Sequence, residues 1–491
     1  MNDAAALSPR NVAPYATLPA WSILGVVSGY ALAWTAIPRD AWWEAGALAL
    51  PALLLSLGLL AGIAAAALRS SGALFRTEHI LIFGLVYWVL LDPIQGSYSL
   101  FSVSEDGVQR SFLGIALFAL FLWLGSTLMT AIRTLLREQV PGPGLDVGPR
   151  FLFGAACLCF LLGVLRILIG CQLVPGCIAD YYFAPRFQGV QGWLGTFGDF
   201  DTLLIQIRFF GYLVLPIAAA LYFVERRASW RVVIAVILGL AFLLLLIKGG
   251  GRRGVGTCLG ATILVWILLR EHISWRHLLM LGAAAVGLLL IMQAMLVWRT
   301  TGTLTAITQG ESLEVKDRAG VIAVDKNFRI LSQITTVIPE RQAHTGVNGV
   351  VYMLTIFIPR SIFPGKPAGR GVDLMTLIDK KERPGWSWTC SSVCDLYLIG
   401  GNLAIAIGGM LYGFAANLTS RLLVRPPSVR SRLLFGILTM TLFVGLRSLH
   451  EVVSTGLAVL ALWGVFGLRG MVVSRRRVLA PVRPPWGRQA S

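Results

Sequence analysis

Long apolar segments alternate with short polar connections along most of the chain. About 17 to 25 apolar residues are enough to carry a helix across the roughly 30 Å hydrocarbon core of a bilayer. We therefore expect an all-α polytopic membrane protein with about twelve transmembrane helices. The predicted spans are residues 17–37, 48–68, 79–95, 111–132, 151–174, 203–224, 232–247, 254–269, 277–297, 393–418, 433–446 and 452–468.

The composition agrees with this class. Of the 491 residues, 56% are hydrophobic and 13% charged, and the mean hydropathy is +0.73. These values exclude a chain built from ordinary soluble domains. The net charge of +18 would suit a nucleic-acid-binding protein, but most of the excess lies in short loops beside spans, where positive charge sets orientation. We expect membrane lipids around the chain and no nucleic-acid partner.

Cysteine and histidine usage predicts no metal site and no cofactor. The five histidines are dispersed, and no spacing typical of metal ligands is present. Cys157, Cys159 and Cys258 lie in predicted spans, where they are expected to act as small apolar residues. Cys171 and Cys177 could form a disulfide if they face an oxidising compartment.

Four basic segments decide the predicted orientation. They lie at residues 133–150, 225–231, 421–432 and 474–478. Threading twelve spans places all four on one side, which the positive-inside rule makes cytoplasmic. Both termini are then expected in the cytoplasm. The N-terminal segment lacks the pattern of a cleaved signal peptide, so we expect it to remain as a tail.

The same threading divides the chain into four parts. Residues 1–297 form a bundle of about nine spans, 298–392 a large extracytoplasmic loop, 393–468 the C-terminal transmembrane helices and 469–491 a basic cytoplasmic tail. Within the loop, the apolar segment 347–359 is short for a span and stops at a proline. Counting it as a span would reverse the orientation of everything after it, so we interpret it as a re-entrant or interfacial helix.

Three cations stand between two predicted spans in the segment KGGGRRGVG, namely Lys248, Arg252 and Arg253. The segment is not a Walker A loop, because the order of glycine, lysine and Ser/Thr is absent. Glycines allow backbone N–H groups to approach an anion, and the next helix starts here with its positive dipole end exposed. A phosphate site on the extracytoplasmic side is one interpretation. Contact with phospholipid headgroups, or snorkelling, is the other.

Two further arginines lie inside predicted spans. Arg166 and Arg208 both fall toward the extracytoplasmic half of the membrane in this topology. An arginine there is costly and usually faces a partner or a wet cavity. An intramembrane ion pair or a snorkelling side chain explains each of them equally well.

The segments 338–367 and 391–413 carry a family resemblance. A proline–glutamate step precedes a short apolar helix and a turn with Pro359, Arg360, Phe363, Pro364, Lys366 and Pro367, and then come Asp395, Tyr397, Gly400 and Gly408. Together with the GGGRRG segment and Arg447, this resembles the oligosaccharide repeat-unit polymerases, the Wzy-type O-antigen and exopolysaccharide polymerases. The chain departs at Asp395, where the family often has glutamate.

The resemblance implies a bacterial inner-membrane glycosyltransferase with a GT-C-like helical bundle. Donor and acceptor would both be undecaprenyl-diphosphate-linked oligosaccharides, and a flippase and a chain-length regulator are candidate protein partners. A hydroxyl of one glycan would attack the anomeric carbon of the other and displace the diphosphate. With no metal-ligand cluster in the sequence, cations would have to stabilise this leaving group. The candidates are Lys248, Arg252, Arg253, Arg360, Lys366 and Arg447.

The attacking hydroxyl needs a general base. The outward-facing candidates are Glu340, His344, Asp395 and Glu451. Each has a plainer explanation: an ion pair for Glu340 and Glu451, a solvated loop position for His344, and helix capping for Asp395. Candidate glycan-binding residues are Trp386, Trp388 and Tyr397, although the two tryptophans would also suit an interfacial aromatic belt.

Other functions remain open from the sequence. A lipid-linked oligosaccharide flippase or other transporter would also need a basic cavity among many spans. An O-antigen ligase would use the same donor with a different acceptor. A purely structural membrane subunit is the remaining alternative.

Overall fold

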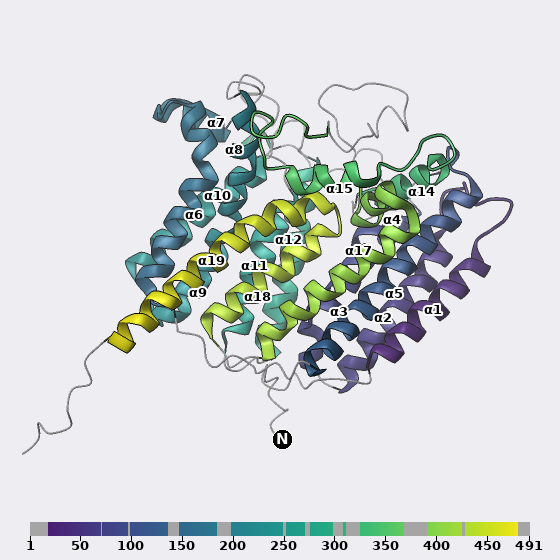
Figure 1. Ribbon diagram of the computed structural model, residues 1–491, viewed down its shortest axis with the longest axis horizontal. Coiled ribbons are helices and arrows are strands. Elements are labelled where there is room, and N and C mark those ends of the chain that lie inside the picture. Colours follow the sequence, from purple (N-terminus) through teal and green to yellow (C-terminus); the bar gives the residue numbers. More distant parts are fainter. Residues whose placement is uncertain are drawn as a thin grey trace, which may run out of the picture.

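The computed structural model describes residues 18–69, 71–96, 99–135, 147–183, 198–248, 252–270, 275–297, 308–310, 325–367, 390–424 and 428–479. Within these ranges all regular secondary structure is helical and no strand occurs. The predicted all-α class is therefore confirmed for this part of the chain. Figure 1 shows the helices gathered into one bundle, with several short helices across one end.

The N-terminal helices are α1 (Leu18–Ala36), α2 (Ala49–Arg69), α3 (Thr77–Leu85), η3 (Val86–Leu90), α4 (Leu91–Gln95) and α5 (Glu105–Leu135). The middle of the chain forms α6 (Pro149–Gly170), α7 (Pro175–Phe183), α8 (Asp201–Ile207), η6 (Arg208–Leu213), α9 (Val214–Glu225), α10 (Trp230–Lys248), α11 (Arg252–Leu268) and α12 (Trp275–Val297). The C-terminal helices are α14 (Asn327–Val337), α15 (Gly346–Thr355), α17 (Ser392–Val424), α18 (Val429–Gly445) and α19 (Leu449–Leu479).

Eight helical segments in the described part of the chain are long and apolar enough to cross a membrane. They are Ala49–Arg69, Thr77–Gln95, Glu105–Leu135, Pro149–Gly170, Asp201–Glu225, Trp230–Lys248, Ser392–Leu423 and Leu449–Phe466. Such segments form helices in lipid because a helix satisfies its own backbone hydrogen bonds. The four other predicted spans are also helical, in α1, α11, α12 and α18, but with shorter apolar segments. The count of twelve spans stays a prediction.

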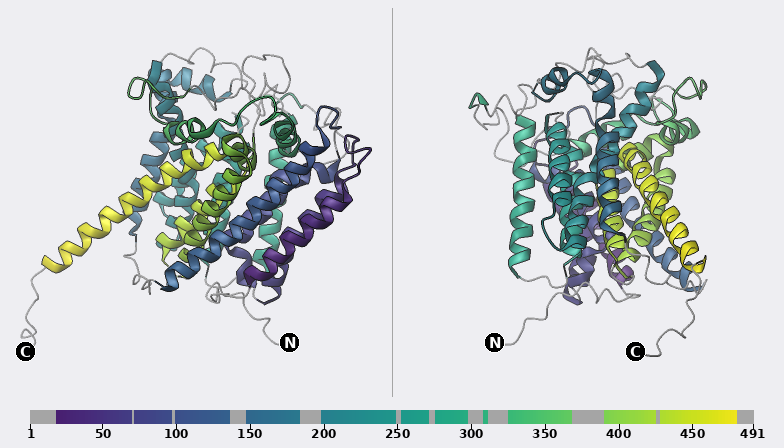
Figure 2. Two further views of the ribbon diagram at one scale, coloured as in Figure 1. Left: turned by 45° about the vertical axis from the view of Figure 1, so that its right-hand side comes forward. Right: turned by 90° about the vertical axis from the view of Figure 1, so that its left-hand side faces the viewer.

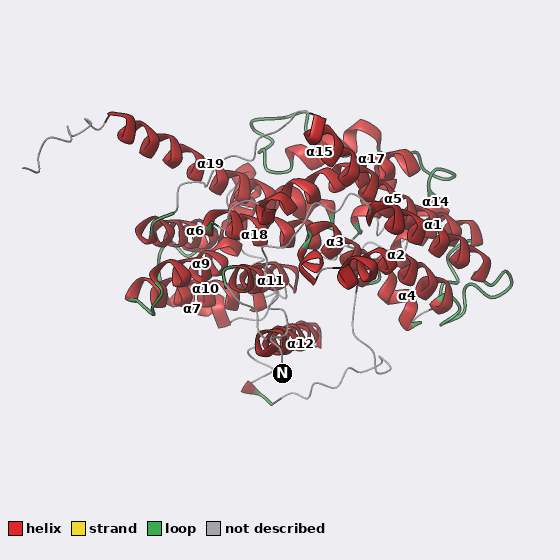
Figure 3. Ribbon diagram, turned by 90° about the horizontal axis from the view of Figure 1, so that it is seen from below, coloured by secondary structure: helices red, strands yellow, loops and turns green. Residues whose placement is uncertain are grey.

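The bundle has two apolar cores. The first joins α1 to α5 with α14 and α17, and the second joins α6, α9, α10 and α11 with α18 and α19. Helix α12 touches both, because Leu288 packs against each core, Met292 belongs to the first and Met295 to the second. Figure 3 shows α12 at one side of the bundle, beside α11.

Glycines bring two helix pairs into close contact. A Cβ atom on Gly413 of α17 would lie 2.1 Å from the carbonyl oxygen of Leu122 on α5, and one on Gly409 would lie 2.6 Å from that of Phe118. The spacing from Gly409 to Gly413 is the GxxxG pattern, which lets backbones approach in membrane helices. The pair α1 and α2 meets in the same way at Gly58.

Helix α17 is broken in its first third. Gly400 (φ −168°, ψ 35°) and Gly401 (φ 62°, ψ −147°) are not helical, and the positive φ of Gly401 favours glycine. The break frees carbonyl groups of the preceding turn, which must find other donors. The backbone N–H of Thr345 donates to the Leu398 oxygen at 2.8 Å, so the turn before α15 is anchored on the break.

Short helices gather at one end of the bundle. In Figures 1 and 2, α7, α14 and α15 all lie at the upper end. Helix α15 covers much of the predicted re-entrant or interfacial segment 347–359, but the helix ends at Thr355. Val347, Val350 and Leu354 are exposed, whereas Gly349 and Met353 are buried. The helix is therefore amphipathic, with an uncovered apolar face.

Candidate functional site

Two arginines from different parts of the chain bind one carboxylate at the upper end of the bundle. Arg252, the first residue of α11, places Nη2 3.0 Å from Oδ1 of Asp325, and Arg447, in the turn between α18 and α19, places Nη2 3.1 Å from the same atom. The Nε atom of Arg447 also donates to Oδ2. All three side chains are only 11 to 15% exposed. The packing of α11 against α18 accounts for this convergence.

A second ion pair lies beside the first. Arg253 donates through Nη1 to Glu451, which is in the first turn of α19. An acidic residue at this position is also favoured by the helix dipole. The i, i+4 spacing of Arg447 and Glu451 in the sequence allowed an ion pair between these two residues. In the structure, Arg447 pairs with Asp325 and Glu451 with Arg253.

Aromatic residues of η3 flank the arginines. The Trp88 ring centroid lies 5.9 Å from Cζ of Arg447, and Nδ2 of Asn327 donates to the Trp88 carbonyl oxygen at 2.8 Å. This segment is a short π-helix, an irregularity common at functional sites. Since Trp88 belongs to the first apolar core and α11 to the second, the arginine cluster lies where the two cores meet.

The cluster formed by Arg252, Arg253, Arg447, Asp325 and Glu451 carries one more positive than negative charge. Burial alone would raise the pKa of the Asp325 carboxyl, but the guanidinium groups of Arg447, Arg252 and Arg253 hold that pKa well below its ordinary value. Asp325 is therefore ionised at physiological pH. Partly buried guanidinium groups suit a polyvalent oxyanion such as phosphate, which they can bind at two points.

The other three predicted diphosphate-binding residues contact the backbone elsewhere. Lys248 donates to the carbonyl oxygen of Tyr181 and lies 3.6 Å from the Tyr181 ring centroid. Lys366 donates to the oxygens of Ile356 and Ile358, both at 3.0 Å, and burial, followed by the charge of Arg360, lowers its pKa. Arg360 is exposed and donates to the Pro367 oxygen at 3.3 Å. None of these contacts links the three to the arginine cluster.

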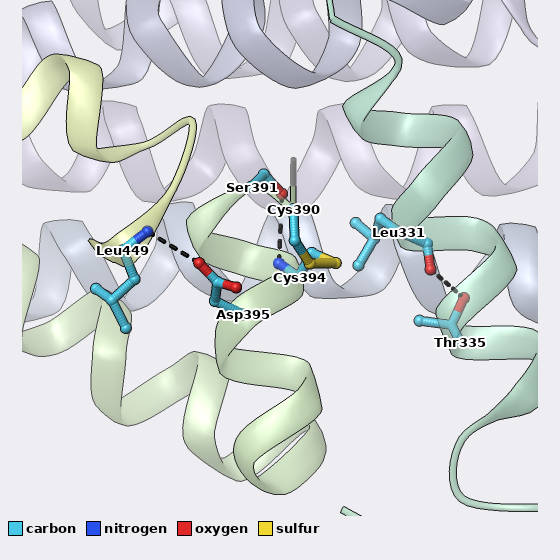
Figure 4. Close-up of a disulfide and its surroundings, with 7 residues drawn as sticks. All are labelled: Leu331, Thr335, Cys390, Ser391, Cys394, Asp395 and Leu449. Carbon is cyan, nitrogen blue, oxygen red and sulfur yellow. Dashed lines mark hydrogen bonds between the residues drawn. A yellow bond between two sulfur atoms is a disulfide. The ribbon is translucent and has the colours of Figure 1, made fainter. Parts of the chain in front are cut away.

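Two more of the predicted acids, besides Glu451, have structural partners. Oε1 of Glu340 lies 3.2 Å from Arg110 in an exposed ion pair. Oδ2 of Asp395 accepts from the backbone N–H of Leu449 at 2.9 Å, as Figure 4 shows. Asp395, which is buried, thus caps the first turn of α19.

His344 differs from these acids in its contacts. Its Nδ1 lies 2.9 Å from the carbonyl oxygen of Tyr397, just before the break in α17. A carbonyl only accepts, so Nδ1 carries a proton and the neutral ring has its lone pair on Nε2. Nε2 points toward the break, 3.3 Å from where a Cβ of Gly401 would lie. This is the tautomer that a general base needs.

Of the three predicted glycan-binding residues, Tyr397 lies in the described part of the chain. Tyr397 is 4% exposed, and its hydroxyl donates to the Ile338 oxygen at 3.1 Å. A ring this buried offers no open face to a sugar, so the position of Tyr397 lends no support to its predicted glycan-binding role. Trp386 and Trp388 lie outside the described residues.

The arginines predicted within spans have different surroundings. Arg166 forms a two-point ion pair with Asp201, with Nε–Oδ1 at 2.8 Å and Nη2–Oδ2 at 3.1 Å. The ion-pair interpretation of Arg166 is therefore the one that the structure supports. Arg208 is exposed at the start of η6.

Two disulfides lie at the same end of the bundle. Cys171 pairs with Cys177, as the sequence allowed, and Cys390 pairs with Cys394, which the sequence did not suggest. The second bridge joins Cys390, two residues before α17, to Cys394 in the first turn of that helix, next to Asp395 (Figure 4). The short spacing of the two cysteines was the available signal for it.

Asp325 is the functional candidate that sequence reasoning missed. Its arginine partners are 73 and 122 residues away, and no motif surrounds it. Comparison with known proteins adds no information, because no family model, no curated protein and no solved structure matches the chain.

Proposed function

We propose that the protein polymerises undecaprenyl-diphosphate-linked oligosaccharide repeat units at the extracytoplasmic face of a bacterial inner membrane. The arginine cluster between the two cores is the observation that carries this proposal. It gathers several partly buried guanidinium groups at one end of a bundle of long apolar helices. A lipid whose headgroup is a diphosphate fits both properties.

The proposed topology is a GT-C-like bundle of about twelve spans with both termini cytoplasmic. Its support is chemical: both disulfides lie at the end that carries the arginine cluster. Disulfides persist in oxidising compartments and are rare in the cytoplasm. That end is therefore assigned to the extracytoplasmic side, in agreement with the loop charges.

In the proposed reaction, Arg252 and Arg447 stabilise the diphosphate as the bond to the anomeric carbon breaks. His344 is the candidate base, with Nε2 accepting the proton of the attacking glycan hydroxyl. The hydrogen bond from Nδ1 to Tyr397 orients the ring. The products are one lengthened lipid-linked glycan and undecaprenyl diphosphate, so atoms and charges balance without a metal or cofactor.

The direct test is elongation of a defined lipid-linked repeat unit by the purified protein. We expect a ladder of products that persists when a metal chelator is present. A deletion strain separates the alternatives: loss of a polymerase leaves single repeat units at the outer leaflet. Accumulation at the inner leaflet would instead indicate a flippase, and full-length polymer left on the carrier lipid would indicate a ligase.

A further inference from the structure

Asp325 occupies the position where an external anion would meet Arg252 and Arg447. Both of its carboxylate oxygens are engaged by these guanidinium groups. Guanidinium binds carboxylate and phosphate with the same two-point geometry. An anion that entered the cluster would therefore compete with Asp325 for the same N–H groups.

We propose that Asp325 is a resident counter-ion that the diphosphate of the substrate displaces when it binds. The proposal deepens the function proposed above and rests on it for the identity of the anion. It also distinguishes among the six predicted cations: Arg252 and Arg447 form the pair that exchanges one anion for another, and Asp325 sets how tightly the incoming anion is held.

The charge balance favours such an exchange. One carboxylate lies between two guanidinium groups, and Arg253 pairs with Glu451 nearby. A diphosphate ester carries more negative charge than one carboxylate and would attract the two guanidinium groups more strongly. Without any anion between them, Arg252 and Arg447 would repel each other. A resident carboxylate keeps them in place until substrate arrives.

The local structure allows the carboxylate to leave. Asp325 lies just before α14, and its carbonyl oxygen accepts from the backbone N–H of Asn327 at 2.8 Å. Asn327 is itself held by the Trp88 carbonyl oxygen. The backbone is thus anchored, and rotation about the two side-chain torsions of Asp325 is sufficient to free the arginines. No helix has to unfold for the exchange.

A purely structural role makes the opposite prediction. If Asp325 only held the arginines in position, its removal would take away the carboxylate that they share, and they would move apart. Anion binding would then weaken. If Asp325 competes with the substrate, the site is open only while the carboxylate is away from the arginines. Removal of Asp325 then strengthens anion binding by a factor equal to the inverse of that open fraction. The sign of the change separates the two roles.

The experiment measures binding of inorganic diphosphate to the purified full-length protein in nanodiscs by titration calorimetry. We expect Asp325→Asn and Asp325→Ala to bind about tenfold more tightly than wild type or better, as for a site that is open at most a tenth of the time. Arg447→Gln is expected to lose binding. Unchanged or weaker binding in folded Asp325→Asn and Asp325→Ala would overturn the proposal.

Asp201→Asn is the matched control. Asp201 forms a two-point pair with Arg166, and both side chains are 13% exposed, close to the values for Asp325. Its substitution is expected to leave diphosphate affinity within about twofold of wild type, since the pair lies outside the cluster. A gain in affinity here as large as in Asp325→Asn would also overturn the proposal, because it would show a general response to an unpaired arginine.

Thermal unfolding of each variant checks that it is folded. If both uncharged variants fail to fold, Asp325→Glu retains the charge. Its longer arm meets the arginine pair less well, so we expect tighter diphosphate binding than in wild type. Equal or weaker binding by Asp325→Glu would count against the exchange.

This assay is independent of polymerisation. Tighter binding by Asp325→Asn, together with failure of the protein to elongate lipid-linked repeat units, would keep the exchange and reject the proposed function. Elongation by wild type without tighter diphosphate binding in the variants would support the proposed function and reject the exchange.

Discussion

Individual side chains in this protein differ mainly in what they are paired with. Arg252 and Arg447 share a carboxylate, Arg253 has its own, and Lys248 and Lys366 are held by backbone oxygens. In the proposed exchange, Arg252 and Arg447 bind the substrate anion in place of the Asp325 carboxylate. Residue type alone therefore did not distinguish the cations suited to bind substrate from those that stabilise loops.

At this scale we predict that Arg447→Lys lowers turnover of lipid-linked repeat units at least about tenfold. Lysine keeps the charge but cannot contact an anion at two points, and loss of one stabilising group in a low-dielectric site typically costs about 2.7 to 4 kcal/mol. Initial rates of elongation would be compared at equal amounts of folded protein. Arg231→Lys is the control, because its pair with Glu225 is at the opposite end of the bundle. Wild-type turnover in Arg447→Lys would argue against a role in catalysis.

We also predict that His344→Gln lowers turnover at least about a hundredfold, in the range typical of general-base catalysis. Glutamine retains hydrogen-bonding capacity toward Tyr397 but cannot accept a proton. Initial rates of elongation by wild type and by the variant would be compared at equal amounts of folded protein. Wild-type turnover in His344→Gln would exclude His344 as the base.

Among the elements, α17 combines a break in the helix with close backbone packing. Its first part is interrupted at Gly400 and Gly401, where the turn before α15 is anchored, and its second part packs backbone to backbone against α5. The break positions His344, while Gly409 and Gly413 set the distance between the helices. Helix α17 thus contacts the candidate base His344 at its break and packs against α5 in the first core.

We predict that Gly413→Ala destabilises the protein, because its new methyl group would lie 2.1 Å from the Leu122 carbonyl oxygen and the helices would have to separate. Gly464→Ala is the matched control, since no atom lies within 4 Å of a Cβ at that position of α19. There, the better helix propensity of alanine is expected to be neutral or stabilising by up to about 1 kcal/mol. Thermal unfolding in detergent tests both variants. Equal unfolding midpoints would contradict the close packing.

The whole molecule has two different ends. The end with α7, α14 and α15 carries both disulfides and the arginine cluster, whereas the turn between α9 and α10 at the other end holds the exposed cations Arg226 and Arg227. This asymmetry agrees with the proposed orientation, in which substrate reaches the cluster from the outer leaflet.

Cysteines introduced at exposed positions test the orientation. We expect Asp106→Cys, at the start of α5, to react with a membrane-impermeant thiol reagent in cells with a permeabilised outer membrane. Arg227→Cys should react only after the inner membrane is broken. The unpaired native cysteines of the described chain lie within α6 and α11 and set the background. The reverse labelling pattern would overturn the orientation and the proposed site of reaction.

Much of the helical architecture could be predicted from the apolar pattern. Every predicted span is largely helical, either in one helix or, at 79–95 and 203–224, in consecutive helical elements. Apolar stretches of this length form helices wherever backbone groups must satisfy one another. The break in α17 was not predicted, because glycine pairs also occur inside continuous helices. The disulfide of Cys390 with Cys394 was missed for a similar reason: spacing permits a bridge but does not require it.

The sequence by itself determined that the chain is helical and apolar, and which loops carry the cations. Only the tertiary structure decided which cations share an anion. The partners of Asp325 are 73 and 122 residues away, and Arg253 is 198 residues from Glu451. Local sequence contains no information about such distances. The pairing follows from the packing of α11 against α18 and from the meeting of two separate cores, which depend on the whole chain.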